Sequence, residues 1–153
     1  MGQMKAERNR REARSAPTPE LDDIHYAALA GFRRALRQAM ADSERICASA
    51  GLTTQRFQAL LAIRACADQA MSVGALAGEL VLKHHSAVEL VGRLEQAGLV
   101  SRKGDPDDKR RVLLTLTQLG AERLSELAKA HSLELARTRQ DMVRTLESLP
   151  GAD

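Results

Sequence analysis

Residues 98–117 read GLVSRKGDPDDKRRVLLTLT. Within this stretch, residues 99–103 and 111–116 are strand-like, and the GDPDD between them is dense in turn-forming residues. The stretch therefore predicts a β-hairpin with a charged tip. The hairpin carries five basic residues: Arg102, Lys103, Lys109, Arg110 and Arg111. A bland alternative is a solvated loop whose charges prevent edge-to-edge pairing of strands.

Two helical segments precede the hairpin. Ser72 can cap a short helix through Leu76 and Leu80, and a longer helix is expected to begin at 84–86 and to end at Gly98. Helix, turn, helix and basic hairpin is the order of a winged helix-turn-helix, in which the second helix fits the DNA major groove and the hairpin follows the phosphates. Near its start the second helix offers hydrogen-bonding side chains: Lys83, His84, His85, Ser86 and Glu89.

Longer helices are expected on either side of this module. Apolar residues recur at helical spacing from residue 21 to 50, and Gly51 is a natural stop. Thr53 or Thr54 can cap a second helix that runs to about residue 67. Thr117 can cap a last helix that runs to about residue 149, before Pro150. The fold class predicted is mainly α, with about six helices and a two-stranded hairpin wing.

Composition excludes several classes of function. The 153 residues include one Tyr, two Phe and no Trp, too few aromatics for the stacking platforms that bind single-stranded nucleic acid. The net charge of +3 equals that of residues 1–16, so a basic patch elsewhere must come from segregation of charge. Residues 1–20 are expected to be a mobile basic arm. Without an apolar run of about 18 residues, the chain is expected to be cytoplasmic, with no membrane partner.

In the order of its helices and in its hairpin, the chain resembles the MarR family of bacterial transcriptional regulators. Residues 108–110, Asp-Lys-Arg, followed by Leu-Thr-Leu-Thr at 114–117, match the family's D-x-R and terminal L-T signature. The helix order resembles the family from about residue 21 to 149. The resemblance implies a homodimer that binds a pseudo-palindromic double-stranded DNA operator. It also implies that the protein is a repressor, and that a small aromatic or anionic effector relieves the repression.

The resemblance also assigns roles and boundaries. In the wing it makes Asp108 the brace, Arg110 the braced or groove-entering residue, and Lys109 and Arg111 backbone contacts. The second helix departs from the family, because Val88-Glu89 and Gly92-Arg93-Leu94 stand where relatives often have Thr-Arg and Asp-Arg-Leu. Arg93 stays a candidate DNA contact, and Glu89 can accept from a cytosine amino group or orient Lys83 or His85. Residues 21–52 and 117–150 are expected to form the dimerisation region, and 53–116 the DNA-binding domain.

The remaining candidates are weaker. Four residues of the first helix are candidates for an effector pocket: His25, Tyr26, Arg33 and Arg37. The alternative is that they cap the helix, pair with Asp22, Asp23 or the partner subunit, or face solvent. Cys47 and Cys66 are expected to be buried and inert, with oxidant sensing as the alternative.

No metal, cofactor or enzymatic activity is expected. His85 and Glu89 have the i, i+4 spacing of metal ligands, but no third ligand accompanies them. Contact with DNA is the favoured interpretation of His84 and His85, and plain surface histidines are the alternative. No nucleophile with its base and no phosphate-binding loop can be assembled from the spacing. The rival function is a helical module that uses the winged-helix fold to dock a partner protein without specific DNA binding.

Overall fold

The computed structural model describes residues 22–105 and 112–147. These residues form five helices and a three-stranded antiparallel sheet, which confirms the mainly α fold class. The elements in chain order are α2 (Asp23–Ser49), α3 (Thr54–Ala65), β1 (Ala70–Ser72), α4 (Val73–Glu79), α5 (His84–Gln96), β2 (Val100–Gly104), β3 (Val112–Leu116) and α6 (Gln118–Glu147). In the described part of the chain, no helix is long and apolar enough to span a bilayer.

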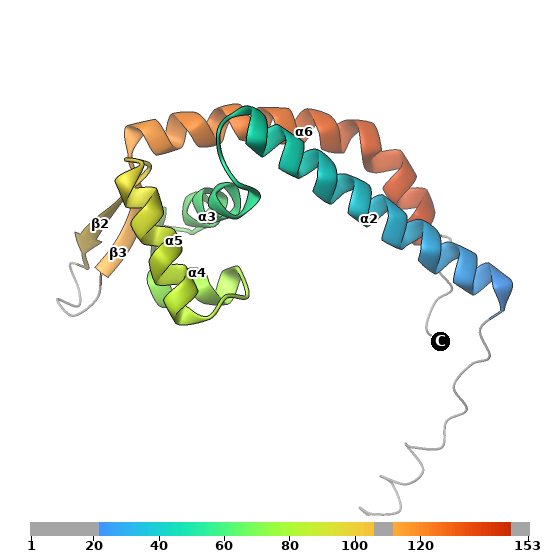
Figure 1. Cartoon of the computed structure of the whole chain (residues 1–153), viewed down its shortest axis with the longest axis horizontal. Coiled ribbons are helices and arrows are strands. Elements are labelled where there is room, and N and C mark those ends of the chain that lie inside the picture. The colour runs from blue at the N-terminus through green and yellow to red at the C-terminus, as the bar shows by residue number, and fades with distance from the viewer. Residues whose placement is uncertain (1–21, 106–111, 148–153) are drawn as a thin grey trace, which may run out of the picture.

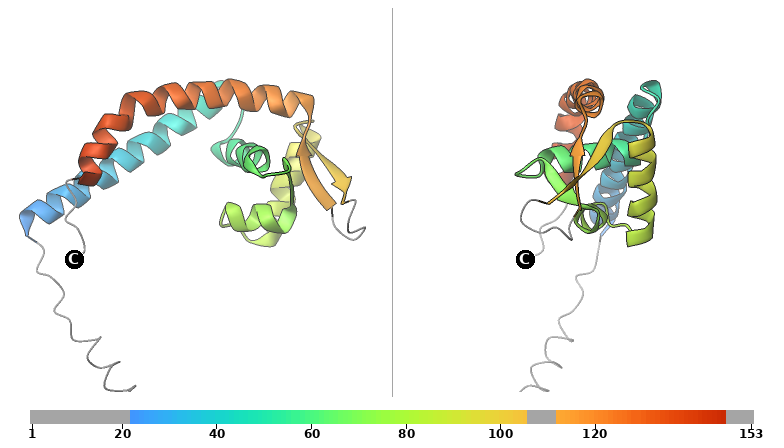
Figure 2. Two further views of the ribbon diagram at one scale, coloured as in Figure 1. Left: turned by 180° about the vertical axis from the view of Figure 1, so that it is seen from behind. Right: turned by 90° about the vertical axis from the view of Figure 1, so that its left-hand side faces the viewer.

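Two long helices and a compact lobe divide the molecule. α2 and α6 lie side by side and extend beyond the other helices and the strands (Figure 1). We call them the long-helix pair, and we call residues 53–116 the lobe. In Figure 2 the lobe lies at one end of the long-helix pair, and α5 and the sheet form the side of the lobe that is farthest from the other end of the pair. At the other end of the pair, no other described helix or strand lies beside α2 and α6 (Figure 1).

Side-chain caps and glycine stops set the helix ends. Thr53, Ser72 and Thr117 each accept a hydrogen bond from a backbone N–H three residues later, which confirms the predicted starts of α3, α4 and α6. Gly51 and Gly98, with φ of 70° and 68°, terminate α2 and α5 in the left-handed conformation that glycine adopts without strain. These signals explain why the elements begin and end close to where the sequence predicts.

The sheet contains a strand that the hairpin pattern did not predict. β3 is the central strand, with β2 on one edge and β1 on the other, and Ala70 pairs with Thr115. Residues 68–70 lie between the helix expected to end at about residue 67 and the one that Ser72 can cap, and the sequence pattern predicts no strand there. β1 is three residues long, too short for an alternating pattern to show in the sequence, and it exists because β3 offers it a second edge.

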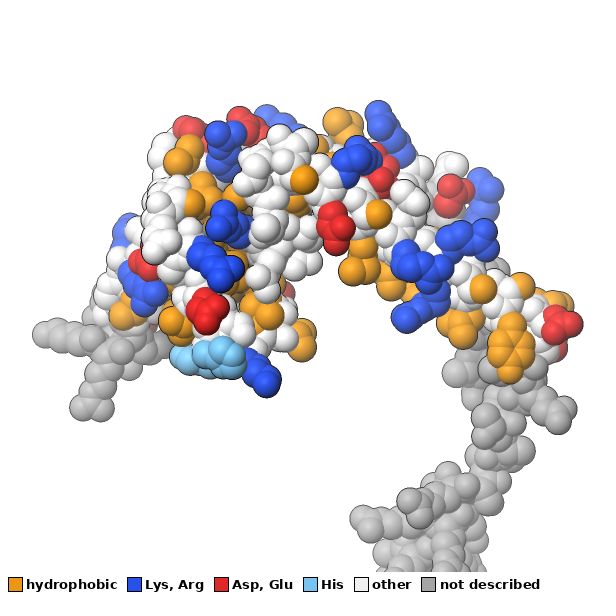
Figure 3. Space-filling model, viewed as in Figure 1, with side chains coloured by type: hydrophobic (Ala, Val, Ile, Leu, Met, Phe, Trp, Pro, Cys, Tyr) orange, Lys and Arg blue, Asp and Glu red, His pale blue; other side chains and the backbone are white. Residues whose placement is uncertain are grey.

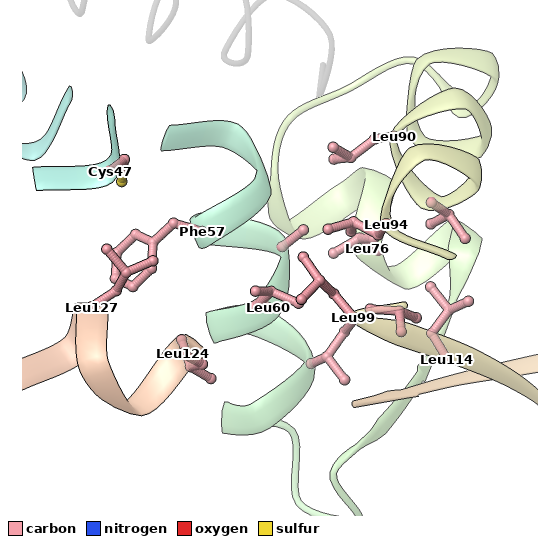
Figure 4. Packing of buried hydrophobic residues seen from close by; sticks show 14 residues of the cluster. Cys47, Phe57, Leu60, Leu76, Leu90, Leu94, Leu99, Leu114, Leu124 and Leu127 are labelled. Carbon is pink, nitrogen blue, oxygen red and sulfur yellow. The ribbon is translucent and has the colours of Figure 1, made fainter. Parts of the chain in front are cut away.

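The core joins the lobe to the near ends of the long helices. Leu60, Leu76, Leu94 and Leu114 are fully buried and come from α3, α4, α5 and β3, so one apolar cluster holds every layer of the lobe together (Figure 4). Leu124 and Leu127 of α6 and Cys47 of α2 extend the same cluster. The lobe is therefore packed against the long-helix pair rather than tethered by loops.

His131 adds a polar connection at this junction. Its ring stacks on Phe57 of α3, with centroids 4.1 Å apart and planes 9° from parallel. Nδ1 lies 2.8 Å from the Leu127 carbonyl and must donate to it, so Nε2, 3.0 Å from Ser43 Oγ, accepts from that hydroxyl in the neutral ring. One side chain thereby connects α2, α3 and α6.

Candidate nucleic-acid interface

Two basic elements of the lobe lie on the same side of the molecule. The N-terminus of α5 and the open ends of β2 and β3 both lie on the side away from α6 (Figures 1 and 2). Between α4 and α5 the chain turns through Val81, whose φ of 53° is left-handed, and Leu82 N–H donates to the Ala77 carbonyl at 2.8 Å. This tight turn projects the first residues of α5 outward.

The start of α5 combines positive side chains with uncapped backbone amides. Lys83 is the N-cap residue and makes no side-chain capping bond, so no side chain of the cap satisfies the first N–H groups of the helix. Lys83, His84 and His85 are exposed, and Ser86 is half-buried. In Figure 3 the histidines form a patch beside a cation at the lower end of the lobe. Such a helix start attracts anions and exposes hydrogen-bond donors.

Further along α5, an ion pair occupies the exposed surface. Arg93 Nη2 lies 3.8 Å from Glu89 Oε2, one turn apart, and both side chains are about two-thirds exposed. A pair this exposed contributes little to stability. Glu89 nevertheless keeps an oxygen that can accept from a base edge, while Arg93 limits the negative charge that Glu89 presents to phosphate.

An ion pair that the sequence did not reveal ties the wing to α5. Arg102 Nε on β2 donates to Glu95 Oε2 at 2.9 Å. Lys103, the next residue, is exposed, and Ser101 and Thr115 pair their hydroxyls across the two strands at 3.1 Å. The hairpin base is thereby fixed relative to the helix. No spacing rule connects Glu95 to Arg102, because the two residues lie on different elements across the Gly98 turn.

Four predicted wing residues lie outside the described residues: Asp108, Lys109, Arg110 and Arg111. The other members of the predicted DNA-contacting set lie at the N-cap of α5, on α5 or on β2. Among the described residues, no group of three or more His, Cys, Asp or Glu side chains could hold a metal ion.

The four effector candidates of α2 divide into two groups. His25 belongs to the capping box at the helix start, where its Nδ1 lies 2.5 Å from Asp22 Oδ1, and this hydrogen bond lowers the pKa of the Asp22 carboxyl. Tyr26, Arg33 and Arg37 are exposed, and their spacing of seven and four residues aligns them on one face of α2. The structure therefore separates His25 from the other three.

The two cysteines differ in environment. Cys47 is fully buried in the core, and burial raises the pKa of its thiol, although hydrogen bonds with Thr54 and Ser43 oppose that shift. Cys66, the C-cap residue of α3, is half-buried. The thiolate is the nucleophilic form, so a buried thiol with a raised pKa is a poor site for oxidation.

We expect iodoacetamide to alkylate Cys66 in the native protein about tenfold or more faster than Cys47, because Cys47 reacts only when the core opens. Mass spectrometry of tryptic peptides over a time course measures the two rates. Cys47→Ser and Cys66→Ser variants assign each rate to its thiol, and both thiols should react alike in denaturant. Equal rates in the native protein would contradict the burial of Cys47.

Comparison with known proteins shows which family this chain resembles. Residues 50–111 match the family model described as "MarR family". Transcriptional activatory protein BadR of Rhodopseudomonas palustris is 39% identical over 71 residues, which cover 46% of this chain and 41% of that protein. The match thus spans less than half of the length of this curated relative.

Solved structures match a larger share of the chain. AbsC, a MarR family transcriptional regulator from Streptomyces coelicolor, superposes with a TM-score of 0.71 at 23% identity, over 82% of this chain and 84% of AbsC. A mutant of MarR from E. coli in complex with operator DNA superposes with a TM-score of 0.63 at 25% identity. That match covers 76% of this chain and 86% of the MarR chain.

Proposed function

We propose that this protein belongs to the MarR family, whose model matches residues 50–111, and that it binds double-stranded DNA sequence-specifically and regulates transcription. The observation that carries the proposal is that the uncapped, basic start of α5 and the open end of the basic strand β2 lie on the same side of the lobe, away from α6. The Arg102–Glu95 ion pair supports it further, since it holds both elements in a fixed relation. Residues 53–116 are the proposed DNA-binding domain.

On this proposal α5 enters the major groove with its N-terminus leading. Lys83 and His84 contact phosphates near the uncapped amides, and His85, Ser86 and Glu89 face base edges. Glu89 accepts from a cytosine amino group, while Arg93 neutralises part of its charge. Arg102 and Lys103 follow the backbone along the wing. Asp108, Lys109, Arg110 and Arg111 keep the roles that the family resemblance assigns to them.

We propose further that a second copy of the chain covers the far part of the long-helix pair, with residues 21–52 and 117–150 as the dimerisation region. The pair exposes an extended series of large apolar side chains, which is unusual for a monomer: Ile24, Tyr26, Leu29, Leu36, Met40, Leu133, Leu135, Val143 and Leu146. A two-fold dimer presents two lobes to DNA, so the operator is an inverted repeat with half-sites about one helical turn, or a multiple of it, apart.

The direction of regulation and its control extend the same proposal. We propose a repressor that a small aromatic or anionic effector releases, with Tyr26, Arg33 and Arg37 as the residues that meet the ligand's ring and charge. The relative from Rhodopseudomonas palustris is named an activatory protein. A fusion of the operator-bearing promoter to a reporter, with and without the protein, measures which direction applies to this chain.

The salt dependence of binding to a duplex tests DNA binding against the rival, a protein-docking module. For a DNA reader, the logarithm of the association constant falls with the logarithm of salt concentration, with a slope of about −0.9 for each phosphate that the protein neutralises. We expect a steep slope for a duplex that carries the operator. A module that docks a protein through apolar surface would show weak binding to all duplexes and would overturn the proposal.

Deletion of residues 1–16 should weaken binding to the same degree on every duplex. Five basic and two acidic residues are removed, so the variant loses sequence-independent attraction to phosphate. The salt slope should become shallower by about 0.9 for each phosphate that the arm neutralises in the wild type. Fluorescence anisotropy with operator and scrambled duplexes at several salt concentrations measures both effects. An unchanged slope would reject this role for the arm.

A further inference from the structure

The outward face of α5 carries a glycine at its centre. Ala87, Leu90, Val91 and Leu94 are buried, and helical spacing places four residues on the opposite side. These are His85, Glu89, Gly92 and Gln96. The face proposed to read DNA is therefore interrupted, one turn beyond Glu89, by a residue without a side chain.

Nothing in the described part of the chain requires a glycine at this position. A Cβ built on Gly92 meets no atom within 4 Å, and its φ is not left-handed, unlike that of Gly98 at the end of the same helix. Gly120 shows the opposite case, where a Cβ would collide with the Leu99 backbone. Alanine is the better helix former in a helix interior. The protein alone would be more stable with alanine at 92, so the described fold does not account for this glycine, and Gly92 differs from Gly78 in lying on the face proposed to read DNA.

The surroundings of the gap indicate what fits it. The side chains three and four residues away on α5 are Val88, Glu89, Glu95 and Gln96. Val88 is 41% exposed and apolar. Glu89 forms an ion pair with Arg93, and Glu95 forms one with Arg102. Their negative charges still disfavour a phosphate in the gap. An uncharged, apolar group beside Val88 is the best match.

We propose that the gap at Gly92 admits the methyl group of a thymine, which packs against Val88 in the major groove. The thymine methyl is the apolar group that base edges present there, and small apolar side chains are its usual contacts. A side chain at 92 would hold that base edge away from the α5 backbone. The inference rests on the proposed function and names Gly92 and Val88 as specificity-determining residues for one position of the half-site.

The test combines a protein variant that fills the gap with DNA that lacks the thymine methyl group. Affinities of the wild type, Gly92→Ala and Gly78→Ala are measured on the selected operator and on duplexes in which each thymine of the half-site becomes deoxyuridine. Gly78 of α4 is the matched control, because a Cβ there also meets nothing within 4 Å. At one position deoxyuridine should weaken wild-type binding about fourfold, the contribution of one buried methyl. Gly92→Ala should bind the thymine operator about tenfold more weakly, because its methyl occupies the same space.

The decisive result is rescue: Gly92→Ala should regain most of its affinity on deoxyuridine at that same position. Its melting temperature should equal or exceed that of the wild type, since alanine favours the helix, and Gly78→Ala should bind like the wild type. Unchanged affinity of Gly92→Ala for the thymine operator, or a loss that no deoxyuridine relieves, would overturn the inference while leaving DNA binding intact. Absence of salt-dependent duplex binding by the wild type would overturn the proposed function and this inference with it.

Discussion

Replacing Gly120 with alanine is expected to lower the free energy of unfolding by about 3 kcal/mol, the upper range for forcing atoms into a packed interior. Gly120 lies buried in the first turn of α6. A Cβ on it would lie 2.0 Å from the Leu99 carbonyl oxygen and 2.9 Å from the carbonyl carbon. Both atoms belong to backbone, so no side chain can rotate away to make room.

The position matters because α6 docks on the lobe through this contact. Thr117 N–H donates to the Leu99 carbonyl at 3.1 Å, and the Thr117 hydroxyl donates to the Gly98 carbonyl at 2.6 Å. An added methyl must push α6 away from the turn that carries β2, which breaks these bonds and loosens the packing of Leu124. The damage therefore reaches both the lobe and its connection to the long-helix pair.

Urea unfolding at one fixed protein concentration, followed by circular dichroism, measures the loss, and the melting temperature should fall by about 6–12 °C. Gly31→Ala in α2 is the control, because a Cβ there makes an ordinary contact of 3.5 Å with Thr145 Cγ2. It should be neutral or stabilise by up to about 1 kcal/mol. Equal stability of Gly120→Ala and the wild type would mean that α6 does not approach Leu99 this closely.

Replacing Arg110 with alanine is expected to weaken operator binding by about 1–3 kcal/mol at fixed salt, which is about fivefold to 150-fold. Arg110 lies outside the described residues, between the end of β2 and the start of β3. The family resemblance makes Arg110 the braced or groove-entering residue of the wing. The described base of the same hairpin supports this assignment, because Arg102 and Lys103 are exposed and the Arg102–Glu95 ion pair directs the hairpin alongside α5.

Two further variants separate a groove contact from general electrostatics. Lys129→Ala removes the same single charge from the exposed surface of α6, and it should change affinity less than about twofold. Asp108→Ala makes the protein more positive, so electrostatics alone predict tighter binding. If Asp108 braces the wing, binding should instead weaken. Anisotropy titrations at one salt concentration measure all three, and unchanged affinity of Arg110→Ala would refute the wing assignment.

The sequence predicted those parts of the fold that depend on local signals. Thr53, Ser72 and Thr117 are capping residues by chemistry, and Gly51 and Gly98 are stops, so helix ends could be located without tertiary information. The strand β1 could not be predicted in this way, since three residues form a strand only where another strand presents a free edge. The close approach of Gly120 to the Leu99 backbone could not be predicted from the sequence either, because Leu99 lies outside α6.

The candidate interface divides in the same way. Spacing alone brought Lys83, His84 and His85 to the start of one helix, because successive residues at a helix start need no tertiary fold to be neighbours. It could not reveal that Glu95 holds Arg102, or that His131 stacks on Phe57, since both contacts join elements far apart in the chain. It also could not show that Gly92 faces open space, which depends on what surrounds α5.

The most direct test of the central claim is selection from random-sequence duplexes with the purified full chain at two salt concentrations, followed by sequencing of the retained DNA. We expect an enriched inverted repeat whose half-sites lie about one helical turn, or a multiple of it, apart, and whose retention falls steeply at the higher salt. Failure to enrich any motif, with retention lost at physiological salt, would contradict the assignment of this surface to DNA.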